Sequence, residues 1–322
     1  PYALHHFTGS REHNTAMRHR AKRAGIKMNE YGLFRSDTND LIICFNETDI
    51  FNALELAYIP PELRENNGEI EASEKGALPN LINDVDIKGI LHVHTRYSDG
   101  LNTIEDMAVA AKERGFAYIG ISDHSQSAYY AGGMKPDTVK RQIDEIDRLN
   151  EKLHPFRILK GVESDILPDG SLDYNEDILE LFDFVVASIH SHFRMEEDKM
   201  TSRVISAMKN RYTTILGHPT GRLLLAREPY SINIDEVLKT AAEKGTIIEI
   251  NCNPYRMDLD WRYQKKAKEM GVKFALCPDA HDIGGIHDIY LGVGIARKGW
   301  LEAGDVINTL GLRDMTALLA RK

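Results

Sequence analysis

The sequence GILHVHTRYSDG at residues 89–100 contains two histidines inside a short apolar run. This run predicts a strand, in which residues two apart point to the same face. The imidazoles of His92 and His94 are therefore expected to project together, with Asp99 following in a turn closed by Gly100. Two histidines beside a carboxylate suit a divalent metal. A lone His-x-His pair is equally compatible with polar residues ending a buried strand, so other parts of the chain must decide.

The composition indicates a globular protein with one large domain or two unequal ones. The chain has 322 residues, 42% hydrophobic residues and a formal net charge of -9. No apolar run approaches the length that spans a bilayer, so no membrane association is expected. The three cysteines, Cys44, Cys252 and Cys277, form no C-x-x-C pair, which argues against a disulfide framework. We therefore expect a reducing, cytoplasmic location.

The charge is distributed unevenly along the chain. Residues 1–35 contain seven Lys or Arg and two acidic residues, a formal charge of +5. Residues 36–86 contain two basic and twelve acidic residues, a formal charge of -10. A basic head, an acidic connector and a nearly balanced body are typical of separate modules.

From residue 87 onward, strand-like and helix-like segments alternate. The predicted strands are Lys88–His94, Ala117–Ser122, Arg157–Glu163, Phe184–Ile189, Thr214–Leu216, Thr246–Asn251 and Lys273–Leu276. Amphipathic helices are predicted between them, at Ile104–Arg114, Pro136–Leu153, Ile234–Lys244 and Asp260–Met270. Repeated βα units of this length predict a mostly parallel sheet. Seven strands favour a (β/α) barrel over an open sheet, although the sequence alone does not exclude the open sheet.

Ligand-type residues follow all seven predicted strands. In chain order they are His92, His94 and Asp99; Asp123 and His124; Glu163 and Asp165; His190 and His192; His218; Asn251 and Asn253; Asp279 and His281. The carboxyl ends of the strands of a parallel barrel meet at one rim, where active sites are built. The recurrence therefore predicts one shared site, although any single member can be an ordinary polar residue at a loop start.

This pattern closely resembles the PHP family, the polymerase and histidinol phosphatase domain, from Ile87 to about Val293. The resemblance implies a distorted (β/α)7 barrel with nine ligands for up to three divalent metals, Mn, Zn or Fe. It implies one metal held by His92, His94, Glu163 and Asp279, a second held by Glu163, His190 and His218, and a third held by Asp99, His124 and His281. His192 is not the motif match. Glu163, Asp279, His92 and His94 are the residues expected to carry catalysis.

A phosphate ester is the expected substrate of such a centre. Metals a few ångströms apart can activate water and neutralise a phosphate in the transition state. Of the basic residues near the rim, Arg222 in HPTGR and Arg256 in NPYR are the favoured phosphate contacts, because arginine binds phosphate in bidentate fashion. Both are equally compatible with solvated surface arginines.

The basic head contains the segment FTGSREHNTAMRHRAKRAG at residues 7–25. It predicts a helix that begins at the N-cap Ser10 and stops at Gly25. The basic residues of this helix, Arg18, Arg20, Lys22 and Arg23, suit either an ordinary solvated face or contact with the phosphates of nucleic acid.

Residues 3–33, with FTGS and NEYGL, resemble the thumb subdomain of family-X DNA polymerases, as does the YIPPELRE string at residues 58–65. The resemblance implies that Asn14 and Arg18 face the DNA minor groove. The polymerising carboxylates of that family lie in a palm upstream of the thumb, and no such palm precedes this segment. The Asp-x-Asp strings Asp84/Asp86 and Asp258/Asp260 lack its glycine-serine context. The chain resembles the C-terminal part of a bacterial family-X repair polymerase.

These observations predict a small α+β thumb-like subdomain at residues 1–65, a linker at 66–86 and a PHP domain at 87–322. The first functional hypothesis is a metal-dependent 3′–5′ exonuclease whose partner is the 3′ end of gapped or single-stranded DNA, with nucleoid association while it is bound. No polymerase activity is expected from these residues. The alternatives are a phosphomonoesterase of the histidinol-phosphatase type, which leaves the basic head unexplained, and a non-catalytic structural PHP module, which the full set of ligands disfavours.

Overall fold

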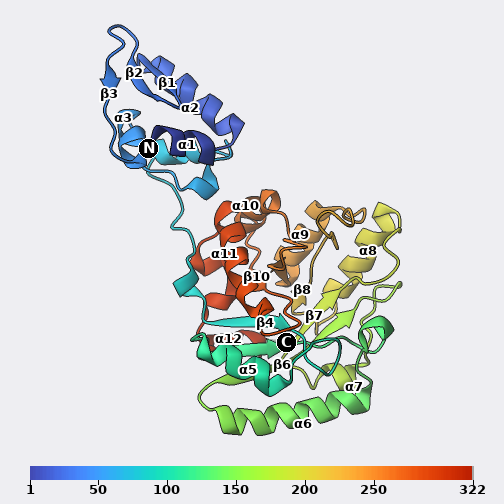
Figure 1. Cartoon of the computed structure of the whole chain (residues 1–322). Coiled ribbons are helices and arrows are strands. Elements are labelled where there is room, and N and C mark those ends of the chain that lie inside the picture. The colour runs from blue at the N-terminus through green and yellow to red at the C-terminus, as the bar shows by residue number, and fades with distance from the viewer. Residues whose placement is uncertain (321–322) are drawn as a thin grey trace. The chain divides into compact units, whose positions relative to one another are not determined.

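The computed structural model describes residues 1–320 and divides them into two compact units. The first unit comprises Pro1–Asn80, and the second begins at Leu81 (Figure 1). Each unit is described by itself below. Among the described residues, none of the helices combines the length and the apolarity needed to cross a membrane.

The first unit combines short helices with a small antiparallel sheet. Its sheet has the order β1-β2-β3, and β1 and β2 are joined by a turn in which the Asn29 side chain accepts hydrogen bonds from the backbone N of Tyr31 and Gly32. The Ser10 side chain accepts from the His13 backbone N, as expected of the N-cap. The elements are α1 (Tyr2–Thr8), α2 (Arg11–Arg23), β1 (Ile26–Asn29), β2 (Gly32–Arg35), β3 (Leu41–Ile42), α3 (Glu47–Ala53), η1 (Pro61–Leu63) and α4 (Glu69–Glu74).

The residues just after position 65 belong to the packed part of this unit. Glu69 is fully buried, and its Oε1 lies 2.6 Å from Nδ1 of His13 in α2. The same carboxylate accepts hydrogen bonds from the backbone N of Asn66 and Asn67. The structure therefore differs from the expected linker at 66–86 in its first part, because residues 66–74 fold onto the thumb-like helices and the first unit continues to Asn80.

The second unit is built on a seven-stranded parallel sheet in the order β10-β9-β8-β7-β6-β5-β4. All seven predicted strands are present, as β4 (Gly89–Val93), β5 (Tyr118–Ile121), β6 (Arg157–Asp165), β7 (Phe184–Ser188), β8 (Ile215–Leu216), β9 (Ile247–Asn251) and β10 (Phe274–Cys277). The edge strands approach one another, since Val93 forms a parallel bridge with Ala280 and the His94 backbone N donates to the Ala280 carbonyl at 2.9 Å. The sheet is thus a nearly closed barrel, and the predicted (β/α)7 fold is confirmed.

The helices of this unit begin where the sequence supplies N-caps. Thr103 caps α5 with a reciprocal capping box, Asn233 caps α9, and Pro136 occupies the first turn of α6. The helices are α5 (Ile104–Glu113), α6 (Pro136–Leu153), α7 (Glu176–Leu179), α8 (Glu197–Met208), α9 (Ile234–Lys244), α10 (Trp261–Glu269), α11 (Ile289–Lys298) and α12 (Leu312–Leu319), with 3-10 turns η2 (Asp84–Asp86), η3 (Tyr129–Ala131), η4 (Gly285–Asp288), η5 (Ala303–Asp305) and η6 (Ile307–Thr309). All four predicted barrel helices are present.

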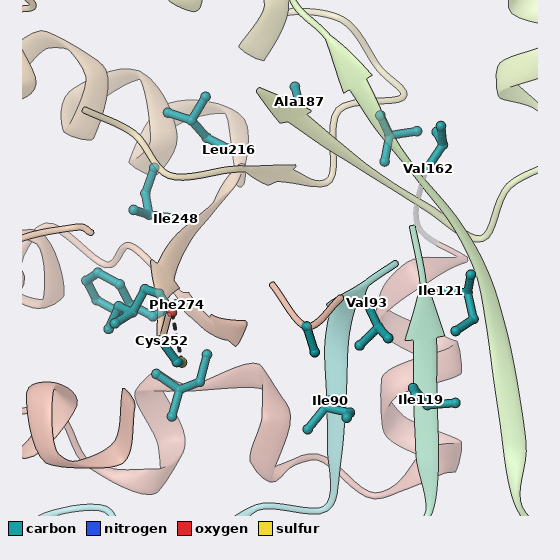
Figure 2. Close-up of a cluster of buried hydrophobic side chains, with 14 of the residues drawn as sticks. Ile90, Val93, Ile119, Ile121, Val162, Ala187, Leu216, Ile248, Cys252 and Phe274 are labelled. Carbon is teal, nitrogen blue, oxygen red and sulfur yellow. Dashed lines mark hydrogen bonds between the residues drawn. The ribbon is translucent and has the colours of Figure 1, made fainter. Parts of the chain in front are cut away.

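Alternation along the strands produces two apolar layers. Ile90, Ile119 and Ile158 belong to the large cluster between the sheet and its helices, part of which Figure 2 shows. Their neighbours in sequence, among them Leu91, Tyr118 and Leu159, form a second cluster with Phe184 and the α12 residues Met315 and Leu319. Period-two alternation places these residues on opposite faces of the sheet. The barrel is therefore filled with side chains, and its polar residues are concentrated at the strand ends.

The boundary of the first unit gives a test by limited proteolysis. Lys75 is exposed and ends the last helix of this unit, whereas Arg64 is fully buried and bonded to Ile59, Thr8 and Glu47. Trypsin is expected to cut first after Lys75 and to leave a stable fragment beginning at Gly76, readable by mass spectrometry. Initial cuts after Arg64, or within the barrel, would contradict this boundary.

Candidate metal centre

The nine expected ligands come from loops and strand ends at the carboxyl edge of the barrel, and the structure brings all nine together. His92 and Glu163 lie within β4 and β6, and the other seven follow strands. The nine residues are His92, His94, Asp99, His124, Glu163, His190, His218, Asp279 and His281. This edge is where parallel barrels assemble active sites.

Glu163 occupies the middle of the cluster. Its carboxylate, 1% exposed, lies within 4 Å of ring nitrogens from five histidines that follow or end four other strands. The distances are 2.9 Å to His124 Nδ1, 2.9 Å to His218 Nε2, 3.3 Å to His92 Nε2, 3.3 Å to His190 Nε2 and 3.6 Å to His94 Nε2. A carboxylate surrounded in this way is placed to bridge two or more cations.

Asp279 and Asp99 hold the other side of the cluster. Asp279 Oδ1 lies 3.2 Å from His94 Nε2 and 3.7 Å from His92 Nε2. Asp99 Oδ1 lies 3.4 Å from His281 Nε2, and its Oδ2 lies 3.7 Å from His124 Nε2. Donor atoms close enough to share one ion group His94 with Asp99, His124 and His281, and His124 with Glu163 and His190. His94 and His124 thus stand between groups that the sequence resemblance implies are separate.

The backbone is shaped around these ligands. His92 and Asp279 have φ angles of 62° and 51°, in the left-handed region that non-glycine residues rarely adopt. Such conformations persist at functional sites, where the surrounding structure enforces them. The Asp99 turn requires Gly100, because a Cβ there would lie 2.5 Å from the backbone N of Thr95.

Two carboxylates that sequence reasoning did not assign orient the histidines. Glu249 is fully buried, and its Oε1 lies 2.6 Å from His92 Nδ1, while its Oε2 accepts from the His218 backbone N. Asp165 Oδ1 lies 2.6 Å from His190 Nδ1. Carboxylates behind metal-binding imidazoles fix the tautomer and the ring orientation. Glu249 could have been recognised from the sequence, because it is the one acidic residue inside the apolar string TIIEIN at residues 246–251.

His92 provides a test of whether the residues fit a metal. Its Nδ1–H donates to Glu249, so Nε2 carries a lone pair when the ring is neutral. That Nε2 is buried, faces the carboxylates of Glu163 and Asp279, and has no hydrogen-bond donor among residues 1–320. Acceptors that face one another in a buried site require a cation between them. The donor set of imidazoles and carboxylates fits Zn, Mn or Fe.

The pKa shifts within the cluster also indicate that this site stabilises positive charge beside its carboxylates. Burial raises the pKa of Glu163, but His190, His124 and His92 outweigh burial and hold it well below its usual range. Burial lowers the pKa of His190, yet Glu163 and Asp165 raise it to about 10. Burial also lowers the pKa of His281, which hydrogen bonding and charge at Asp99 and Asp279 raise to about 9. Protons and metals therefore compete for the same nitrogens.

Cys277 lies near His92 and Glu249, at the end of β10. It is fully buried, and burial together with the Glu249 charge raises the pKa of its thiol far above the ordinary value. A neutral thiol is a poor ligand, since metals bind the thiolate. Cys277 is therefore a core residue.

The two arginines expected to bind phosphate differ in availability. Arg222 donates from Nε to the Arg256 carbonyl and from Nη1 to Asp260 Oδ2, each at 2.9 Å, and from Nη2 to the Met257 carbonyl. Its guanidinium is committed to the loop after β9, so the structure does not support the expected phosphate contact. Arg256 instead points its Nε to within 3.4 Å of Asp279 Oδ2, and its buried Nη1 has no hydrogen-bond partner among residues 1–320.

The expected DNA-facing residues of the first unit also differ. Asn14 is 7% exposed, and its Nδ2 donates to the carbonyls of His6 and Gly9, at 2.7 and 3.2 Å. It therefore fastens the turn between α1 and α2 instead of presenting its amide to solvent. Arg18 is exposed on α2, with one contact of 3.5 Å from Nη2 to Thr15 Oγ1, and remains open to a ligand. His192 is exposed beyond the cluster.

Comparison with known proteins gives two family matches. The DNA polymerase beta thumb model matches residues 3–65, and the PHP domain model matches residues 91–253. The chain is 43% identical over 321 residues to the DNA polymerase/3′-5′ exonuclease PolX of Bacillus subtilis (strain 168), covering all of this chain and 56% of that protein. It is thus about half the length of this relative.

Other similar proteins match about three-fifths of the chain. The chain is 35% identical over 207 residues to a probable phosphatase of Thermoanaerobacter sp. (strain X514), covering 59% of this chain and 77% of that protein. A candidate histidinol phosphatase from Listeria monocytogenes has a similar structure, with a TM-score of 0.50 and 14% identity over 62% of this chain and 97% of that one. This likeness shows the fold alone.

A matched pair of variants tests whether Glu163 is a metal ligand and Glu249 a carboxylate that only supports the ligand His92. Glu163→Gln is expected to remove at least two bound metal ions, because it deletes the central charge. Glu249→Gln is expected to keep the metals but weaken their affinity about 10- to 100-fold, because an amide oxygen cannot serve both His92 and the His218 backbone N. Metal content and calorimetric titration measure both variants.

Glu243→Gln, an exposed change on α9, is the control for the loss of one carboxylate and should bind metals as the wild type does. If Glu249→Gln lost metals as completely as Glu163→Gln, Glu249 would be a ligand. If Glu163→Gln bound metals normally, the central role of Glu163 would be wrong.

Proposed function

We propose that this chain, which belongs to the PHP family, is a metal-dependent phosphodiesterase that removes nucleotides from the 3′ ends of DNA. The observation that carries the proposal is the presence of a polymerase thumb and a complete PHP donor set on one chain. The similarity of the whole chain to 56% of a relative named as a DNA polymerase/3′-5′ exonuclease supports it. A phosphatase acting on small metabolites has no need of a basic, thumb-like head.

The proposed metal ligands are those that the family resemblance implies. His92, His94, Glu163 and Asp279 form one group, Glu163, His190 and His218 a second, and Asp99, His124 and His281 a third. When bound, such metals supply Lewis-acid activation of water and charge neutralisation at the phosphorus. Glu163 fixes the spacing between the groups, and Glu249 and Asp165 hold the His92 and His190 rings in place.

Arg256 is the proposed phosphate contact at this centre. It reaches Asp279 through Nε, and its Nη1 is buried without a partner in the described chain. A guanidinium donor in such a position can bind a phosphoryl oxygen of the substrate. We assign it to positioning the scissile phosphate against the metal ligands.

We propose that the thumb-like unit binds DNA independently of the nucleotide sequence. Arg18 and Arg23 are exposed on α2, whereas Arg20 is bonded to the Leu54 carbonyl and to Glu74. Exposed arginines displace counterions from phosphates. The Bacillus relative is also named as a polymerase. We assign no polymerisation to the residues described here, and propose that a palm subdomain upstream in a longer parent chain carries it.

A phosphomonoesterase is the second candidate function. The 35% identity of the chain, over 207 residues, to a protein named as a probable phosphatase favours it. The same ligands serve both reactions, so the two functions differ in the substrate that reaches the metals. A purely structural PHP module is disfavoured, because all nine donors converge and the buried His92 Nε2 demands a cation.

The reaction is tested with Mn²⁺-loaded protein on 3′-labelled single-stranded oligonucleotides and on p-nitrophenyl phosphate. Stepwise release of nucleoside monophosphates from the 3′ end is expected. Asp279→Ala should abolish this release, since it removes a ligand, and should leave equilibrium binding of the oligonucleotide within about twofold. Ready hydrolysis of p-nitrophenyl phosphate without cleavage of oligonucleotides would refute the nuclease function in favour of the phosphatase.

The thumb contribution is tested by Arg18→Ala combined with Arg23→Ala. DNA binding should weaken, and the slope of log affinity against log salt should become less negative by about 2, because up to two phosphate contacts are lost. Hydrolysis of a mononucleotide ester should not change. The control pair is Lys140→Ala with Arg141→Ala, which removes two charges from α6 and should not alter the salt dependence. An unchanged slope in the α2 variant would exclude α2 from the DNA contact.

A further inference from the structure

Two adjacent tyrosines stand on the loop that follows β5. Tyr129 is 86% exposed and Tyr130 is 70% exposed. The loop is anchored at both ends, since the Met134 backbone N donates to the His124 carbonyl at 2.9 Å and Ser125 forms a parallel bridge with Met134. The Tyr174 hydroxyl also donates to the Met134 carbonyl. The two rings therefore project from a fixed loop between Ser125 and Met134, which directly follows the proposed metal ligand His124.

Only one of these rings reaches the metal centre. The Tyr130 ring centroid lies 6.0 Å from that of His124 and 6.2 Å from that of His190, at interplanar angles of 63° and 65°. Within residues 1–320, Tyr129 has no comparable ring contact. Tyr130 is thus a mostly exposed aromatic ring in contact with two proposed ligands.

The charges around Tyr130 suit a nucleotide. Arg256 and Arg227 are close enough to interact electrostatically with Tyr130. Arg227 is held by its Nε bond to the Gly221 carbonyl and by the Phe193 ring, 4.1 Å from its guanidinium carbon. An exposed aromatic ring therefore lies near two cationic groups.

We propose that the Tyr130 ring stacks on the 3′-terminal base of a DNA strand while Arg256 holds the scissile phosphate at the metals. Aromatic side chains beside cationic groups are how proteins bind unpaired nucleic acid, because every base offers a π-face. The inference rests on the proposed nuclease function. It adds the element that distinguishes a nucleotide terminus from a small phosphate ester, which presents no base to the ring.

The binding arm uses a single-stranded oligonucleotide with 2-aminopurine as its 3′-terminal base and Ca²⁺ in place of Mn²⁺ to suppress turnover. Stacking on Tyr130 should quench the fluorescence on binding. Tyr130→Ala should remove the quenching and Tyr130→Phe should keep it, since the phenyl ring also stacks. Tyr129→Ala is the matched control on the same loop and should behave as the wild type does.

The kinetic arm compares a normal 3′ terminus with one whose last nucleotide is abasic, using Mn²⁺-loaded protein. Tyr130→Ala should lower kcat/KM on the normal terminus about 5- to 150-fold, the range that corresponds to loss of one stacked base. It should leave kcat/KM on the abasic terminus within about twofold. Unchanged metal content and circular dichroism show that the variant is folded and loaded.

The outcomes separate this inference from the proposed function. Cleavage by the wild type with equal effects of Tyr130→Ala on both termini would overturn the stacking inference alone. A loss in Tyr130→Phe as large as in Tyr130→Ala would also overturn it, because the hydroxyl would then be the active group. Quenching without cleavage would uphold the stacking surface and refute the nuclease function. If the wild type showed no quenching and no cleavage, the stacking inference and the nuclease function would both be refuted.

Discussion

The centre of the second unit depends on one buried carboxylate. Glu163 is removed from water, and a buried charge is costly unless opposite charge compensates it. Five imidazoles supply that compensation, and they come from the ends of four different strands. The nearly closed barrel is what allows such convergence, because parallel strands direct their carboxyl ends to one rim. The geometry of the barrel and the chemistry of the site therefore depend on each other. A change in strand order would separate the imidazoles from the Glu163 carboxylate that they stabilise.

Closure of the barrel matters most on the side of β10. Asp279 reaches His92 and His94 only because the segment after β10 pairs with β4, through the Val93–Ala280 bridge and the bond from the His94 backbone N to the Ala280 carbonyl. The left-handed backbone at His92 and Asp279 turns both side chains toward the cluster. Glu249 of β9 then links the ends of β4 and β8, since its carboxylate meets both the His92 ring and the His218 backbone. The rim is thus held by hydrogen bonds as well as by whatever cations it binds.

Local alternation and the direction of the strands predicted the strands, the barrel and a shared site at the strand ends, and the resemblance to the PHP family implied which nine residues would form it. Sequence reasoning missed what depends on side-chain partners distant in sequence. Glu249 and His92 are 157 positions apart, and only the curvature of the sheet brings them together. From the sequence, Arg222 and Arg256 were equal candidates for contact with a substrate phosphate. The structure distinguishes them, because Arg222 is hydrogen-bonded to the loop after β9. Residues 66–74 read as an acidic linker because the partner of Glu69, His13, lies in a different helix.

A metal cluster of this kind does not by itself select a substrate. Imidazoles and carboxylates determine which cations bind and how the charge of a phosphate is neutralised, and these requirements are shared by monoesters and diesters. Selection must therefore come from groups outside the donor set. In the second unit those groups are Arg256, with a buried unpaired donor, and Tyr130, an exposed ring against two of the histidines. In the first unit they are the exposed arginines of α2. Under the proposed function, the first pair would act at the reacting nucleotide and the arginines on the DNA backbone without regard to sequence, a combination that suits removal of successive nucleotides from any DNA end.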